Sequence, residues 1–125
     1  MKILLVDDSR TMRNIWKKIL AKMDGAEITE AEDGVQGLSC VEGQGPFDLI
    51  LLDWNMPNMD GITLLKKIRE KKILTPVIMV TTEAEKPRII EAIKAGASNY
   101  MVKPFTPDAL YGKIEETLKK VPAKA

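Results

Sequence analysis

The sequence predicts a doubly wound α/β fold, in which helices cover both faces of a five-stranded parallel sheet. Short apolar runs alternate along the chain with segments whose apolar residues recur every three or four positions. Some of these runs are uninterrupted, as in strands that are buried on both faces. Gly, Pro, Asn and Asp residues lie between the segments and supply turns. Strands that alternate with helices in this way form a parallel sheet in three layers.

The first strand and the first helix are predicted near the start of the chain. Residues 3–6 form an apolar run that ends at Asp7 and Asp8. In the helix that follows, the apolar positions are Met12, Ile15, Trp16, Ile19, Leu20 and Met23. Gly25 is expected to end this helix. Residues 28–31 then alternate between apolar and polar, which predicts a half-exposed strand at an edge of the sheet.

The middle of the chain contains the second helix, the third strand and the third helix. Asp33 can cap the second helix. The apolar residues of that helix are Val35, Leu38 and Val41, and the turn-forming residues after it are Gly43, Gly45 and Pro46. Residues 49–52 are wholly apolar and run into Asp53, so a buried strand is predicted to end on a carboxylate. After a turn, helical spacing resumes with Ile62, Leu64, Leu65 and Ile68.

The fourth strand and the fourth helix follow. Residues 77–80 form an apolar run that gives way to Thr81 and Thr82. The next helix is expected to end at Gly96. Three of its residues are expected to point inward, and they are Ile89, Ile90 and Ile93.

The last strand and the last helix complete the predicted alternation. Residues 98–102 form the strand, which stops at Lys103. Thr106 as the cap and Pro107 at the first helical position then start a helix. The apolar residues of this helix are Leu110, Ile114 and Leu118. Residues 120–125 are expected to form a frayed, solvated tail.

Composition and charge restrict the classes of function. With 19 Lys and Arg against 18 Asp and Glu the net charge is +1, so nothing in it indicates nucleic acid or an acidic membrane as a partner. Cys40 cannot form an internal disulfide, and no His is available as a nucleophile, base or metal ligand. The apolar run after Met1 is too short for a signal peptide, and no run could cross a membrane. We expect a soluble cytoplasmic protein with one domain, residues 1–125.

Reactive side chains follow the predicted strands at the points where the strands end. Ligands bind parallel sheets beyond these carboxyl ends. The first strand ends in Asp7 and Asp8, and the third ends in Asp53. If these two strands are neighbours, three carboxylates converge, and two carboxylates 4 Å apart repel by roughly 4 kcal/mol at an effective dielectric constant near 20. Such a cluster requires a counter-charge.

The residue types at these strand ends fit phosphoryl transfer. Hard oxygen ligands suit Mg²⁺, which commonly bridges protein carboxylates and a phosphate. Lys103 supplies a second, fixed cation, and Thr81 or Thr82 a hydroxyl. Since carboxylates do act as phosphate acceptors, the set is suited to receive a phosphoryl group.

Each of these residues alone has a simpler interpretation. An isolated Asp after a strand is more often a helix cap. Thr81 or Thr82 alone is more often only a β-forming residue, and Lys103 alone a solvated surface cation. It is their joint occurrence that favours a functional site.

Six motifs in the chain resemble the receiver domain of two-component response regulators, and within that family the single-domain chemotaxis regulators. They are VDDS at 6–9, EDG at 32–34, DWNMPNMDG at 53–61, MVTTEA at 79–84, AGAS at 95–98 and VKPFT at 102–106. The motifs occur in the family's order and span nearly the entire chain. The resemblance implies the flavodoxin-like strand order 2-1-3-4-5, which is documented for this family.

The resemblance also implies roles for the acidic residues. Asp53 would be the phosphoacceptor. Asp8 and Asp53 would bind Mg²⁺ directly, Asp7 would act on it through water, and Asn55 would supply its backbone carbonyl to the metal. The protein would then be a signalling protein that promotes only its own phosphorylation and autodephosphorylation, and not an enzyme.

Three further residues acquire expected roles by the same resemblance. Thr81 would donate a hydrogen bond to the phosphoryl group, and Lys103 would pair with it. Tyr100 would move inward when Thr81 is drawn toward the phosphate. The Lys103–Pro104 peptide bond is expected to be cis in this family, although X-Pro bonds are cis in only about 5% of cases.

Because the chain contains no histidine, the phosphoryl donor is expected to be external, either a phosphohistidine on a sensor kinase or a small acyl phosphate. Because no effector domain follows Pro122, the target is expected to be a separate protein. The resemblance implies a sensor histidine kinase of the chemotaxis type as the donor and a flagellar motor switch protein as the target. A phosphatase is a third candidate partner, and the protein itself is expected to be a monomer. The partner surface would include Ile89, Ile93, Tyr100 and Lys113, although simple core packing explains Ile89 and Ile93 equally well.

Three alternatives remain at this point. A Mg²⁺-dependent aspartyl phosphatase of the haloacid dehalogenase type would require a second Asp where the chain has Asn55. A flavin- or nucleotide-binding module would require a glycine-rich turn where the chain has Asp7 and Asp8. The chain could also be a receiver domain cut from a longer regulator.

Overall fold

The computed structural model describes residues 1–23, 25–82, 86–103 and 105–119. Two of the predictions lie outside these residues: the cis peptide bond between Lys103 and Pro104, and the frayed tail at 120–125. Within the described residues, no helix is both long and apolar enough to cross a membrane.

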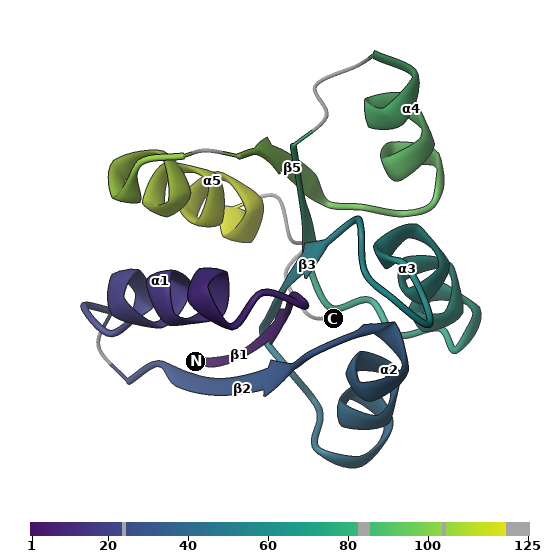
Figure 1. Ribbon diagram of the computed structural model, residues 1–125, viewed down its shortest axis with the longest axis horizontal. Coiled ribbons are helices and arrows are strands. Elements are labelled where there is room, and N and C mark those ends of the chain that lie inside the picture. Colours follow the sequence, from purple (N-terminus) through teal and green to yellow (C-terminus); the bar gives the residue numbers. More distant parts are fainter. Residues whose placement is uncertain (24, 83–85, 104, 120–125) are drawn as a thin grey trace.

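Five strands alternate with five helices along the chain (Figure 1). The strands are β1 (Lys2–Val6), β2 (Glu27–Ala31), β3 (Leu49–Asp53), β4 (Val77–Thr81) and β5 (Asn99–Val102). The helices are α1 (Arg10–Leu20), α2 (Gly34–Gly43), α3 (Gly61–Glu70), α4 (Lys86–Lys94) and α5 (Pro107–Lys119). The alternation predicted from hydrophobic periodicity is therefore confirmed.

The five strands form one parallel sheet in the order β2-β1-β3-β4-β5. This is the expected flavodoxin-like, doubly wound order. The registers pair Val6 with Leu52, and Asp53 with Val80. Because neighbouring strands end at nearly the same level, the residues that follow them share one edge of the sheet.

The helices form a layer on each face of the sheet (Figure 1). α1 and α5 pack on one face, where the core contains Trp16, Leu20, Leu110 and Ile114. α2, α3 and α4 pack on the other face, where the core contains Val41, Leu64, Ile68 and Ala92. β3 and β4 are buried along their whole length between these layers, whereas the edge strands β2 and β5 are partly exposed. The central strands can therefore hold a charged residue rigidly at their ends.

Polar side chains cap four of the helices. The Ser9 hydroxyl accepts a hydrogen bond from the Met12 amide, and the Asp33 carboxylate accepts one from the Gln36 amide. The Asp60 carboxylate accepts one from the Thr63 amide, and the Thr106 hydroxyl accepts one from the Ala109 amide. The predicted caps Asp33 and Thr106 are confirmed, and Pro107 is the first helical residue of α5.

The inward face predicted for the fourth helix is wrong in part. Ile90 is 44% exposed and Ile93 is 59% exposed, whereas Ala92 is 1% exposed. The helix lies with its smallest apolar residue, Ala92, in the core on this face of the sheet. Two large isoleucines are consequently left on the outside of α4.

The inward face of the first helix also differs from the prediction. Ile15 is 43% exposed, and Arg13 is buried in its place with 6% exposure. The buried face of α1 contains a row of residues at spacings of three and four, namely Arg13, Trp16 and Leu20. The buried face therefore includes the Arg13 side chain in place of Ile15. A buried arginine requires polar partners, and these lie next to the site described below.

Gly61 allows α3 to begin directly against the end of β3. A Cβ at this position would lie 2.1 Å from the backbone oxygen of Asp53, and the Gly61 amide donates to the Trp54 carbonyl at 2.8 Å. Only glycine permits this close approach. The loop between Asp53 and Gly61 is thereby held against its own strand.

Gly112 in α5 offers a stability test away from the site. A Cβ at this position would have no neighbour within 4 Å, and the residue is exposed in the middle of the helix. Gly112→Ala is expected to raise the free energy of unfolding by about 0.5–1 kcal/mol, because alanine has less conformational entropy to lose. Urea denaturation measures the change, and a less stable variant would contradict the geometry of α5.

Candidate functional site

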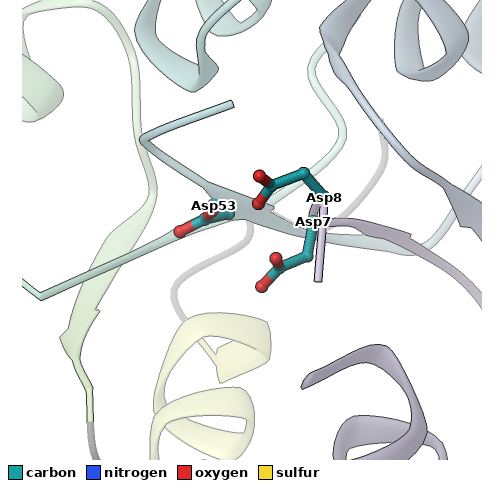
Figure 2. A group of neighbouring side chains, drawn as sticks. All are labelled: Asp7, Asp8 and Asp53. Atoms are coloured by element: carbon teal, nitrogen blue, oxygen red, sulfur yellow. The ribbon is translucent and has the colours of Figure 1, made fainter. Parts of the chain in front are cut away.

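Three carboxylates gather at the carboxyl edge of the sheet (Figure 2). Asp7 and Asp8 follow β1, and Asp53 ends β3, which is the neighbour of β1. One oxygen from each carboxylate lies within 4.8 Å of the others. Asp7 is fully buried and Asp53 is 6% exposed, whereas Asp8 is open to solvent. The cluster predicted from the strand ends therefore exists.

Lys103 joins the two buried carboxylates. Its Nζ lies 3.0 Å from Asp7 Oδ2 and 3.2 Å from Asp53 Oδ1, and it donates a hydrogen bond to each. The backbone amide of Lys103 donates to the carbonyl of Thr81 at 2.7 Å. The cation is thus held over the carboxylates by the adjacent end of β4.

The environment changes the proton affinities of this group. Burial raises the pKa of Asp53 from its usual 3.8 to about 6, and the charge on Asp7 adds to the effect, while Lys103 opposes it. Burial alone would lower the pKa of Lys103. Its hydrogen bond to Asp7 and the charges of both carboxylates outweigh burial and raise that pKa above its usual value. Lys103 is one positive charge among three carboxylates, so it does not neutralise the cluster when no metal is bound.

The donor set fits a hard divalent cation. Carboxylate oxygens from three residues lie close enough to share one ion, and the open side at Asp8 leaves room for water. Backbone at the start of the β3–α3 loop lies next to Asp53, where the exposed Asn55 follows two residues later. The arrangement can therefore hold a cation between two strand ends.

Thr81 and Tyr100 lie on the β4 and β5 side of the site. Thr81 ends β4 and is 3% exposed, and Tyr100 in β5 is half-buried. Both line a small pocket under the start of α4, and its other lining residues are Trp54, Met79, Arg88, Ile89 and Ala92. The structure thus places Thr81 and Tyr100 against the same pocket.

The residues predicted for a partner surface have different environments. Ile93 is exposed, Ile89 is half-buried and lines the pocket beside Tyr100, and the Lys113 Nζ lies 5.9 Å from the Tyr100 ring centroid. Core packing therefore explains Ile89 in part, but it does not explain Ile93.

Sequence reasoning missed three contacts around the site. Arg13 donates to the carbonyl of Asp7 at 2.6 Å, and the Arg88 guanidinium lies 4.8 Å from the Trp54 ring centroid. Asn58 donates to the Asp33 carboxylate at 2.8 Å and so ties the β3–α3 loop to the start of α2. A signal existed only for Arg13, whose position matches the buried helical row of Trp16 and Leu20.

Comparison with known families distinguishes a receiver domain from an aspartyl phosphatase and from a flavin- or nucleotide-binding module. The model of the response regulator receiver domain matches residues 3–115. The chain belongs to this family. A receiver domain is a signalling module and not a conventional enzyme, so membership favours neither the aspartyl phosphatase nor the flavin- or nucleotide-binding alternative.

Relatives narrow the place of this receiver domain within the family. It is 46% identical over 120 residues to a chemotaxis protein CheY homolog of Campylobacter jejuni, covering 94% of this chain and 92% of the relative. It is 45% identical over 122 residues to the chemotaxis protein CheY1 of Helicobacter pylori, covering 94% and 97%. The predicted assignment to the chemotaxis response regulators is thereby confirmed.

A solved structure supports the same fold. The receiver domain of the Francisella response regulator 1452 superposes with a TM-score of 0.87 at 34% identity, covering 95% of this chain and 97% of that one. The two proteins therefore share the receiver fold.

Proposed function

We propose that this receiver domain accepts a phosphoryl group on Asp53 from the phosphohistidine of a chemotaxis-type sensor kinase, in the presence of Mg²⁺. The observation that carries the proposal is the contact of Lys103 with both Asp7 and Asp53, beside the open carboxylate of Asp8. This arrangement presents a nucleophile, a fixed cation and a cation site within one small space. Asp8, Asp53 and the Asn55 carbonyl would hold Mg²⁺, with Asp7 acting through water.

The residues of the chain supply most of the chemistry. A carboxylate oxygen of Asp53 attacks the phosphorus and forms a P–O bond, while the P–N bond to the donor histidine breaks and the imidazole departs with that electron pair. Mg²⁺ supplies neutralisation of the phosphoryl oxygens when bound. Lys103 pairs with one of these oxygens, and the Thr81 hydroxyl donates a hydrogen bond to another. Water later attacks the same phosphorus, the P–O bond to Asp53 breaks, and inorganic phosphate leaves while Asp53 regains its free carboxylate.

The phosphorylated state would be transmitted through β4 and β5. A phosphoaspartate adds charge and strong acceptor oxygens, which attract Lys103 and the Thr81 hydroxyl. Movement of Thr81 toward the phosphate vacates space in the pocket that it shares with Tyr100, so the Tyr100 ring can turn inward. The pocket thus links the state of Asp53 to the surface of β5.

The output would be a change in binding to a separate protein. We propose that the target is a flagellar motor switch protein, which contacts Ile93, Tyr100 and Lys113 with some contribution from Ile89. The proposal includes a monomer in the cytoplasm, without nucleic acid or membrane contact and with a phosphatase as a third partner. A pull-down with and without phosphorylation checks these partners.

Phosphopeptide mapping tests the central proposal. Wild-type protein incubated with a small acyl phosphate and Mg²⁺ should acquire one phosphoryl group, labile to alkali and to hydroxylamine, in the peptide that contains Asp53. A chelator should prevent the incorporation. Incorporation on a different residue, or undiminished incorporation without divalent metal, would contradict the proposal.

Trp54 offers a direct test of the metal. Because it follows Asp53 in the chain and is 3% exposed, its fluorescence should change when millimolar Mg²⁺ binds beside it. Trp16 is the other tryptophan, and its ring centroid lies 5.8 Å from the Lys103 Nζ, so the titration is best done in a Trp16→Phe background. A signal that is indifferent to Mg²⁺, together with no heat of binding by calorimetry, would count against the cation site.

A further inference from the structure

Asp7 is held by hydrogen bonds on each of its polar groups. Its amide donates to the Ala31 carbonyl at 3.1 Å, and its carboxylate accepts from the Ser9 amide at 2.8 Å and from the Lys103 Nζ at 3.0 Å. Its carbonyl accepts from Arg13 at 2.6 Å. Of these four partners, only Arg13 reaches Asp7 from within a helix, α1, and Arg13 has no proposed part in the chemistry of the site.

Arg13 has further contacts that anchor it to the edge strand β2. Its Nε donates to the Glu30 carboxylate at 3.0 Å, and its other terminal nitrogen lies 3.8 Å from a carboxylate oxygen of Glu32. The Arg13 side chain is only 7% exposed. Lys17 pairs with the second oxygen of Glu30 at 3.1 Å on the exposed side of the same network. Arg13 therefore connects α1, β2 and the loop that carries Asp7 and Asp8.

The position of Arg13 is unfavourable for helix stability. The first turn of α1 contains no acidic residue, and a cation near a helix N-terminus opposes the helix dipole. Burial of a guanidinium adds a desolvation cost that only good hydrogen bonds offset. A positive charge beside a cation site also repels the incoming metal. Since all three effects are unfavourable, we infer that Arg13 contributes through the position in which it holds its hydrogen-bond partners.

We propose that Arg13 is a positioning residue for the cation site, which sets the place of Asp7 and Asp8 by fixing the Asp7 carbonyl against β2. The planar guanidinium holds Asp7 and Glu30 from two different nitrogens, so the loop between β1 and α1 cannot shift without breaking one of the bonds. Groups that orient metal ligands commonly change metal affinity by about 10-fold or more when they are removed. The inference rests on the proposed function, because it concerns the same site.

The test compares the Mg²⁺ dissociation constants of Arg13→Gln and Arg13→Lys with that of the wild type, by calorimetry. Positioning predicts that both variants bind Mg²⁺ more weakly, Arg13→Gln by roughly tenfold. A purely electrostatic role predicts the opposite for Arg13→Gln, which loses a repelling charge, and no change for Arg13→Lys, which keeps it. Tighter or unchanged binding by Arg13→Gln would overturn the inference. If Arg13→Gln does not fold, Arg13→Lys decides in the same way.

Two neighbouring variants sharpen the comparison. Lys17→Met removes the exposed cation that shares Glu30 and should leave Mg²⁺ binding unchanged. Glu30→Gln loosens the anchor of Arg13 and should weaken binding, and its effect should be less than additive with that of Arg13→Gln. Equal weakening by Lys17→Met would overturn the inference, because it would indicate a general loss of packing around α1.

Amide exchange gives a second readout that needs no metal. In the presence of a chelator, the Ser9 amide should exchange faster in Arg13→Gln than in the wild type, because its acceptor Asp7 is less firmly held. Failure of the wild type to bind Mg²⁺ would contradict the metal site of the proposed function. Normal binding by the wild type, with unchanged affinity and Ser9 exchange in the variants, would overturn the inference about Arg13 alone.

Discussion

Asp53→Asn is expected to abolish phosphoryl incorporation from an acyl phosphate. The amide oxygen of asparagine is a much weaker nucleophile than a carboxylate, and the other two acids are held differently. Asp7 is engaged by Ser9 and Lys103, and Asp8 is the member of the cluster that is open to solvent. Radiolabel incorporation with Mg²⁺ over the same time course as the wild type measures the loss.

Asp108→Asn is a suitable control for this prediction. Asp108 lies exposed in the first turn of α5 and is not one of the three clustered acids, so its replacement should leave incorporation unchanged. Undiminished labelling of Asp53→Asn would show that another residue is the acceptor.

The same substitution is expected to stabilise the metal-free protein at neutral pH. The pKa of Asp53 is raised from 3.8 to about 6 in the folded state, so the folded protein binds the Asp53 proton more tightly than the unfolded chain does. The contribution of Asp53 to stability is therefore fully present below pH 4 and is lost as the pH rises through about 6. Above pH 6 this amounts to a cost of up to about 3 kcal/mol, which a neutral asparagine avoids.

Urea denaturation with a chelator at pH 7.5 and at pH 4.5 measures this effect. The stability advantage of Asp53→Asn should be large at the higher pH and should shrink at the lower one, because Asp53 of the wild type is then mostly protonated. Mg²⁺ should narrow the difference at pH 7.5 by binding the folded wild type. Equal stabilities of the two proteins at pH 7.5 would contradict the raised pKa of Asp53 in the folded protein.

Hydrophobic periodicity was sufficient to predict the alternation of strands and helices. Uninterrupted apolar runs such as residues 49–52 have no competing interpretation once helical segments flank them. The faces of the helices were harder to predict. Ile93 in α4 was expected inside and is exposed, whereas Ala92 is buried in the core in its place. Hydrophobicity ranks isoleucine above alanine, but packing of a short helix can favour the smaller residue.

The candidate site was predictable because its residues follow strands. Parallel strands end at one edge of the sheet, so Asp7, Asp53 and Lys103 could be expected to meet once the strand order was known. The strand order itself came from resemblance to a family and not from spacing. The burial of Arg13 was not predicted, because α1 contains several basic residues and such residues usually lie on the solvated face of a helix. Its burial depends on the Asp7 carbonyl, 6 positions away in the chain, and on the Glu30 carboxylate, 17 positions away, which only the fold brings against it.

The sequence by itself determined the alternation of elements, the family and the acids at the strand ends, because each of these depends on local composition and spacing. The tertiary structure alone decided which groups touch. It placed Lys103 across two carboxylates, gave Asp53 its raised pKa and buried Arg13 against Asp7. Distances and burial arise from the packing of segments up to 96 positions apart, such as Asp7 and Lys103, and no local pattern encodes them.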